Sequence, residues 1–232
     1  MGYRMVGVCL MGVLSGCLEL EGNGHEVTET REVREISRVE NESPFDVDIE
    51  QGQEFRVRVR IDSNLQRVVE TRVRNDVLHI QADEWFIDVP PGPHVLITMP
   101  RLDKLENNGS GSVFAAWFEQ DDEVELRLSG SGDLSFEGAV PSIVSELNGS
   151  GDLYLSGNTE SAELSIRGSG DIEARDLTAA EADLTVDGSG DLRVTVDGPV
   201  DARVDGSGDV ELSGDVRRGR FSENGSGRIQ VR

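Results

Sequence analysis

Cysteine is almost absent from this sequence. Cys9 and Cys17 are the only two among 232 residues, and both lie close to the start. The chain beyond residue 17 therefore contains no thiol and can form no disulfide. Whatever fold it adopts must be held together by apolar burial and hydrogen bonding.

Basic residues and histidine are also scarce. Lys and Arg together number 22 against 45 acidic residues, which gives a net charge of −23 and excludes a phosphate-binding, nucleic-acid-contacting face. The three histidines are isolated from one another in the sequence, so no His and Cys metal cluster and no base beside a nucleophile is apparent. We therefore expect a protein that is not an enzyme.

The first 16 residues have the pattern of a signal peptide. Arg4 precedes an apolar run over residues 5–14, which is too short to span a bilayer. Leu14-Ser15-Gly16-Cys17 then has the arrangement of a lipoprotein cleavage site. The sequence predicts that Cys17 is the first mature residue and carries the lipid that attaches the protein to a membrane.

This prediction places the protein outside the cytoplasm, on the cell envelope. Leu18 follows the cysteine, where Asp would favour retention in the inner membrane, so the outer membrane is the expected site. Residues 17–35 are acidic and lack hydrophobic periodicity, and we interpret them as a tether.

A repeat dominates the rest of the chain. Gly-Ser-Gly occurs seven times, at spacings of 18 to 21 residues, beginning at Gly109, Gly130, Gly149, Gly168, Gly188, Gly206 and Gly225. Apolar residues occupy the even offsets from each first glycine and polar residues occupy the odd ones, which is the alternation of a half-buried β-strand. Both glycines are then expected to face inward.

A repeat of about 19 residues cannot bury its apolar face alone, but a stack of parallel coils can. The sequence thus predicts an all-β fold, a right-handed parallel β-helix or solenoid of about seven coils. One domain is expected over residues 36–232, with the repeats in 105–232. Residues 36–104 alternate similarly without the glycines and are expected to form an irregular β-rich cap.

The motifs Asn148-Gly-Ser-Gly-Asp-Leu153 and Asp187-Gly-Ser-Gly-Asp-Leu192, with the preamble Ile97-Thr-Met-Pro-Arg-Leu102, resemble the putative auto-transporter adhesin, head GIN domain family. The resemblance covers roughly residues 36–232. It implies a parallel β-helix in an envelope protein and supplies no catalytic motif.

A column of aspartates follows the glycines in the five inner repeats: Asp133, Asp152, Asp171, Asp191 and Asp209. Stacked carboxylates about 5 Å apart repel one another. Calcium could bridge them. Alternatively, each aspartate could accept hydrogen bonds from the backbone of its bend.

Aromatic residues make up only 5% of the chain, and two pairs stand out, Trp85-Phe86 and Trp117-Phe118. They could form an exposed recognition patch for a surface glycan or protein, or they could plug the cap.

These features favour a non-catalytic, membrane-anchored binding or structural module. One alternative is a carbohydrate-active β-helix enzyme, which requires a groove with clustered carboxylates and an aromatic platform. Another is an envelope-sensing partner of a regulatory protein.

Overall fold

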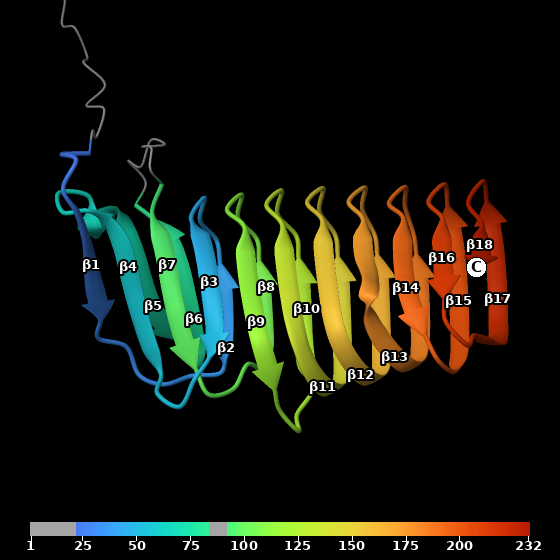
Figure 1. Ribbon diagram of the computed structural model, residues 1–232. Coiled ribbons are helices and arrows are strands. Elements are labelled where there is room, and N and C mark those ends of the chain that lie inside the picture. Colours follow the sequence, from blue (N-terminus) through green and yellow to red (C-terminus); the bar gives the residue numbers. More distant parts are fainter. Residues whose placement is uncertain (1–21, 84–91) are drawn as a thin grey trace, which may run out of the picture.

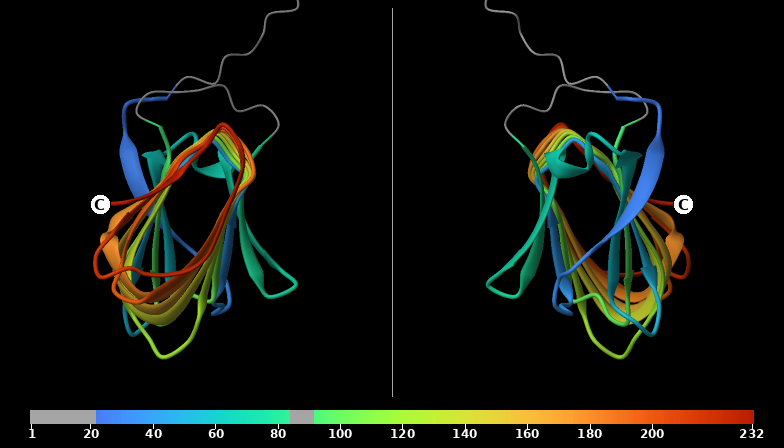
Figure 2. Two further views of the ribbon diagram at one scale, coloured as in Figure 1. Left: turned by 90° about the vertical axis from the view of Figure 1, so that its right-hand side faces the viewer. Right: turned by 90° about the vertical axis from the view of Figure 1, so that its left-hand side faces the viewer.

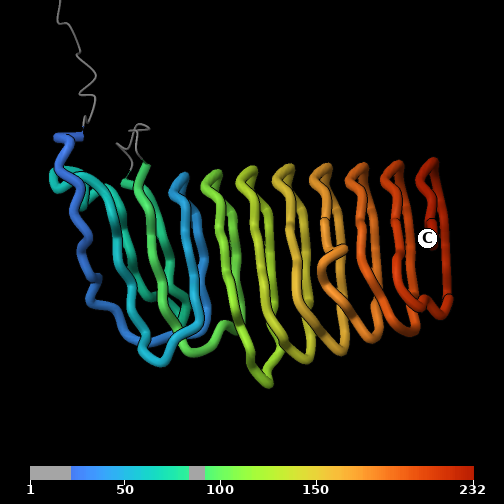
Figure 3. Tube along the Cα trace, in the orientation of Figure 1, coloured from blue at the N-terminus to red at the C-terminus, as the bar shows by residue number. Residues whose placement is uncertain are grey.

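The computed structural model describes residues 22–83 and 92–232, and these form a single elongated stack of β-coils (Figures 1 and 3). The described residues contain 18 strands and one short 3₁₀ helix, Gln66–Val68. The predicted all-β solenoid of about seven repeat coils is confirmed. No helix in these two segments is long and apolar enough to cross a bilayer.

Two walls of strands enclose the core (Figure 2). The front wall in Figure 1 consists, in spatial order, of β1 (Glu26–Arg31), β4 (Arg56–Asp62), β7 (His94–Met99), β3 (Asp46–Gln51), β9 (Val113–Glu119), the first parts of β11 (Leu134–Leu147), β12 (Leu153–Ile166) and β13 (Ile172–Val186), then β14 (Leu192–Val196), β16 (Val210–Ser213) and β18 (Ile229–Val231).

The back wall consists, in the same direction, of β5 (Val69–Arg74), β6 (Val77–Ala82), β2 (Arg38–Asn41), β8 (Lys104–Asn107), β10 (Val124–Leu128), the last parts of β11, β12 and β13, then β15 (Pro199–Gly206) and β17 (Arg217–Gly225).

Parallel, in-register pairing places the same repeat position of each coil directly beside its counterpart. Leu134, for example, pairs with Leu153, and Leu153 pairs with Ile172. All three are fully buried. The apolar columns seen in the sequence are therefore the core of the stack, because each coil covers the edge of the one before it.

The Gly-Ser-Gly segments form the narrow bends where the chain passes from the back wall to the front wall. Successive bends approach so closely that a Cβ on Gly151 would lie 2.2 Å from the carbonyl oxygen of Gly132. In the inner repeats the second glycines are buried as expected, the first glycines are half-buried, and the serines are exposed. The glycines are required because the neighbouring coil occupies the space of a side chain.

The cap does not follow the order of the sequence. β2 pairs with both β6 and β8, and β3 pairs with both β7 and β9. The coil made by residues 38–51 thus lies between two coils that come later in the chain. Beyond it, β4 pairs antiparallel with β7 and β5 with β6, which ends the regular stack.

Residues 17–35 were interpreted from the sequence as an acidic tether. Within this segment, Glu26–Arg31 forms β1 and pairs antiparallel with β4 along its length, so this part of it is a strand of the fold. Only Val27 and Arg31 in this strand are partly covered, so its burial pattern is faint. The strand forms because its backbone hydrogen bonds to the edge of β4, which would otherwise be left unpaired.

Candidate functional site

The outer face of the front wall gathers most of the residues to which the sequence drew attention. In-register pairing aligns its outward side chains in rows that cross the strands. One row, from the cap towards the last repeats, contains Arg58, Leu96, Asp48, Phe114, Ser135, Tyr154, Glu173, Arg193 and Glu211. A ligand lying on this face along the stack would meet these side chains in turn.

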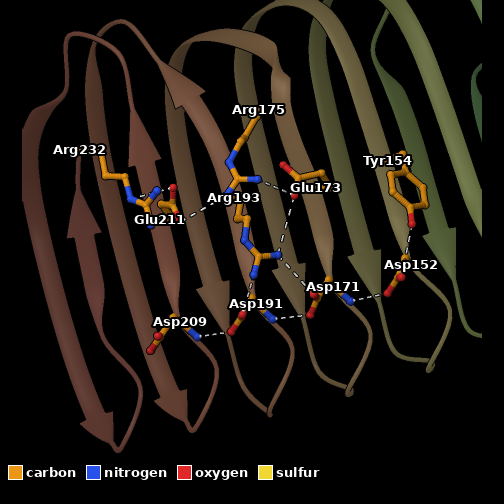
Figure 4. A network of polar contacts seen from close by, with 10 residues as sticks. All are labelled: Asp152, Tyr154, Asp171, Glu173, Arg175, Asp191, Arg193, Asp209, Glu211 and Arg232. Atoms are coloured by element: carbon orange, nitrogen blue, oxygen red, sulfur yellow. Dashed lines mark hydrogen bonds and ion pairs between the residues drawn. The ribbon is translucent and has the colours of Figure 1, made fainter.

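The predicted aspartate column lies beside this row, at the bends. Each Oδ1 atom accepts a hydrogen bond from the backbone N–H at the same position in the next coil (Figure 4). The N···O distances are 2.8–2.9 Å from Asp133 to Asp209, and Arg228 donates the last bond to Asp209. The aspartates therefore bind the backbone of the neighbouring coil and not that of their own bend.

Arginine side chains neutralise much of the negative charge in the later repeats. Arg193 approaches Asp191 at 2.8 Å and Asp171 at 3.3 Å, and Arg175 joins Glu173 to Glu211 (Figure 4). Burial alone would lower the pKa of Arg193, but the hydrogen bond to Asp171 and the surrounding carboxylates raise it. This half of the face is thus a paired network of charges.

The aromatic pair of β9 is divided between core and surface. Phe118 is fully buried and stacks on Phe136 with ring centroids 6.2 Å apart, so it plugs the core and belongs to no exposed patch. Trp117 instead has 73% of its surface exposed. The other pair, Trp85 and Phe86, lies outside the described residues.

A β-bulge separates the two members of the pair. Ala115 pairs with Phe136 and Phe118 with Gly138, so Ala116 and Trp117 together oppose a single residue of β11. Trp117 has a φ of 63°, in the left-handed region that bulky residues rarely adopt. The bulge turns the indole outward while both of its neighbours remain buried.

Trp117 borders a surface hollow of about 260 Å³ between the cap and the first repeat. Asp48, Glu50, Arg58 and Phe114 also line it. Asp48 contacts His94 Nε2 at 2.7 Å, and Glu50 accepts a hydrogen bond from Thr98. The Nε atom of Arg58 is buried and has no hydrogen-bond partner within the part of the chain that the structure describes.

A group with the composition of a metal site lies on the opposite, back wall. His79 Nδ1 lies 3.1 Å from Glu40 and 3.5 Å from Glu42, and the three ligand atoms fall within 4.8 Å of one another. Gln81 and Asn108 donate hydrogen bonds to the two carboxylates. These contacts and hydrogen bonds already engage the imidazole and both carboxylates, so the arrangement is self-contained.

Sequence reasoning missed three residues of the front face: Arg58, Phe114 and Tyr154. Phe114 and Tyr154 share a signal that could have revealed them, because each follows the first glycine of its repeat by five residues. That odd offset points outward, where an aromatic residue gains nothing from the core. Arg58 carries no comparable signal, since Arg56, Arg58 and Arg60 alike alternate with apolar residues in one strand.

The sequence profile of a family described as "Putative auto-transporter adhesin, head GIN domain" matches residues 36–231. No curated protein sequence matches the chain.

Solved structures share the fold. A putative adhesin from Bacteroides fragilis NCTC 9343 superposes with a TM-score of 0.82 at 21% identity, covering 92% of this chain and 100% of that one. A putative lipid binding protein from Parabacteroides distasonis ATCC 8503 gives 0.72 at 23% identity, with 92% and 99% covered. A putative adhesin from Parabacteroides merdae ATCC 43184 gives 0.71 at 20%, with 92% and 98% covered.

Proposed function

The chain belongs to the putative auto-transporter adhesin, head GIN domain family, and on this basis we propose that it is a non-catalytic binding module displayed on the cell envelope. The adhesin descriptions of its family and of two structural relatives support a role in attachment.

The distribution of exposed apolar residues carries this proposal. Large hydrophobic side chains are exposed at four of the described positions, and three of these, Phe114, Trp117 and Tyr154, lie on the front face. Solvent-exposed aromatic side chains gathered on one face are typical of recognition surfaces. On binding, each of them buries a large area while losing little conformational entropy. The fourth, Val231, lies in the last strand.

Binding rather than catalysis is favoured by the way the titratable groups are used. The aspartates hold neighbouring coils together, and the arginines and glutamates of the later repeats pair with one another. Such groups stabilise the stack and do not converge on a reacting atom.

In this proposal the lipid on Cys17 holds the solenoid at the outer membrane. The first described strand, β1, begins at Glu26 at the capped end of the stack. The anchor therefore joins the protein at the end that carries the cap, and the repeats extend away from it. The aromatic face stands beside the cap, accessible to ligands outside the membrane.

An attachment assay tests the proposal. A Gram-negative host displaying the full chain should adhere to epithelial monolayers or mucin-coated plates more than cells displaying the Phe114→Ser, Tyr154→Ser double variant. Val231→Ser is the matched control, because its side chain is exposed to a similar extent (44%) away from the patch. Equal attachment by the parent and the double variant, at equal surface levels, would contradict the proposal.

The hollow beside Trp117 also keeps the enzyme alternative open to test. Asp48 and Glu50 both line it, and paired carboxylates cleave glycosidic bonds. Incubating the chain with polysaccharides and measuring new reducing ends separates the two functions. If the protein is a binding module, the parent chain should produce no more reducing ends than the Asp48→Asn, Glu50→Gln double variant.

A further inference from the structure

The backbone of Trp117 is strained in a way that the fold does not require. A bulge residue with positive φ is ordinarily glycine, because glycine has no Cβ to clash with the backbone. Here the position holds the largest side chain, and the indole is mostly exposed and so contributes little to the core. Strain kept for an exposed side chain indicates that the side chain is used in binding.

Arg58 provides a second, independent observation. Its Nε atom is buried and has no hydrogen-bond partner among the described residues, so the guanidinium is not tied to a carboxylate through that atom. Arg56 lies on the same strand and face but has a partner, because its guanidinium pairs with Glu54 at 2.8 Å. Arg58, which lines the hollow, is thus a donor still available to an incoming acceptor.

The remaining residues of the hollow define the chemistry of that ligand. Asp48 and Glu50 offer carboxylate oxygens that accept hydrogen bonds from hydroxyl groups, and Phe114 and Trp117 offer flat apolar surfaces. Sugar rings present this combination, with hydroxyls around the edge and C–H groups on the faces. The hollow, of about 260 Å³, suits one ring rather than a large ligand.

Tyr154 extends the aromatic surface beyond the hollow. It lies in the same row as Phe114, with Ser135 between them, so the two rings are two strands apart. At the usual strand spacing this corresponds to roughly 10 Å along the stack. A chain of sugars that stacks on Phe114 can therefore continue over the small serine to Tyr154.

Charge decides between neutral and acidic sugars. The protein has a net charge of −23, and the two carboxylates of the hollow outnumber Arg58. Acidic polysaccharides would be repelled as they approach. A polypeptide partner would need a contact surface several times larger than this hollow provides.

From these observations we propose that the hollow binds one ring of an uncharged polysaccharide, with Phe114 and Trp117 as stacking surfaces, Arg58 as donor and Tyr154 holding the next part of the sugar chain. The inference rests on the proposed binding function and names the class of ligand for that face.

Calorimetry on the full chain in mild detergent tests the inference. The neutral probes are cellohexaose, mannohexaose, xylohexaose and maltohexaose, and the anionic probes are hyaluronan and polygalacturonate oligosaccharides. We expect at least one neutral probe to bind and the anionic probes to bind at least about tenfold more weakly at low salt. In a Trp85→Phe background, which leaves Trp117 as the only indole, the same probe should shift the fluorescence.

Two pairs of variants separate binding from folding. Trp117→Gly should lower the affinity for the neutral probe at least about tenfold while the melting temperature stays the same or rises, because glycine relieves the strain. Asn75→Gly is its control, since Asn75 also has positive φ but lies in the β5–β6 hairpin away from the hollow. Arg58→Gln should weaken binding, and Arg56→Gln should not.

Three results would overturn the inference. They are binding of none of the neutral probes at millimolar concentration, tighter binding of the anionic probes, and unchanged affinity in Trp117→Gly. If the aromatic face still mediates attachment to cells while no neutral sugar binds, the adhesive function stands and only the ligand class is wrong. If both fail, the proposed function fails as well.

Discussion

The Oδ1 atom of Asp152 accepts a hydrogen bond of 2.9 Å from the backbone N–H of Asp171, one coil further along the stack. The same bond recurs from Asp133 to Arg228. A backbone donor at the bend, where the two walls join, is thereby satisfied by a side chain of the preceding coil. The aspartate column is consequently part of the stacking between coils.

Asp152→Ala should lower the free energy of unfolding by about 1.5–3 kcal/mol, because it removes a charge-assisted hydrogen bond and leaves an N–H of the bend without its acceptor. Asp152→Asn should cost less than about 1 kcal/mol, since the amide oxygen can still accept the bond. Urea unfolding of both variants measures the difference.

Calcium should leave the melting temperature of the parent protein unchanged if the column serves only this role. A melting temperature that rises with calcium, and no longer does so when Asp152, Asp171 and Asp191 are replaced by Asn, would instead support cation bridging between the coils.

Gly151→Ala should destabilise the protein by about 1–3 kcal/mol or more, because the added methyl group would meet the Gly132 carbonyl oxygen and push two coils apart. Gly92→Ala is the matched control, since nothing lies within 4 Å of a Cβ at that position. Comparing the thermal unfolding of the two variants separates the effect of the clash between coils from the general effect of replacing a glycine. Equal melting temperatures would contradict the close contact.

Stability should fall in acid partly through Asp103. Burial, the largest single influence, raises the pKa of this carboxyl, but hydrogen bonds from Arg101 and Ser37 and the charges of Arg101 and Arg38 together lower it. A lowered folded pKa contributes stability above the unfolded value of about 3.9 and loses it as pH falls through the folded value. Asp103→Asn should flatten the acid limb below about pH 4 in urea unfolding measurements. An unchanged slope would contradict this assignment.

Cys17→Ser should release the protein from the membrane if lipid on that thiol is the anchor. The parent chain, expressed with radiolabelled palmitate in a Gram-negative host, should be labelled and should sediment with membranes, and the variant should be neither labelled nor sedimented. Cys9→Ser should behave as the parent, because residue 9 lies within the predicted signal peptide. Labelling of the Cys17 variant would argue against this anchor.

The repeats were predictable from the sequence because their stabilising interactions repeat with it. Parallel stacking places equal repeat positions side by side. The strand register can therefore be read from the spacing of the paired glycines and of the apolar column Leu134, Leu153 and Ile172. The cap was predicted only as β-rich. Its strand order depends on pairings between β2 and both β6 and β8, and no local pattern encodes such distant partners.

The candidate site was predictable only in part. Trp117 stood out as an aromatic residue in a chain that has few, but alternation alone could not say which member of the Trp117-Phe118 pair faces solvent. The bulge decides this by inserting one residue into β9. Arg58 emerges only when β4 is placed beside β7, because its importance lies in a missing partner and not in its own residue type.

The interleaved cap has a consequence for how such a protein can change over evolutionary time. The strands of each repeat coil pair only with the coils on either side, so duplicating or deleting one unit of about 19 residues would lengthen or shorten the rod and leave the strand pairing of the remaining coils intact. The coil of residues 38–51 cannot be handled in this way, because segments from two later parts of the chain close over both of its edges. Variation in copy number should therefore be confined to the repeats, where it would set how far the rod reaches while the hollow beside the cap keeps its shape.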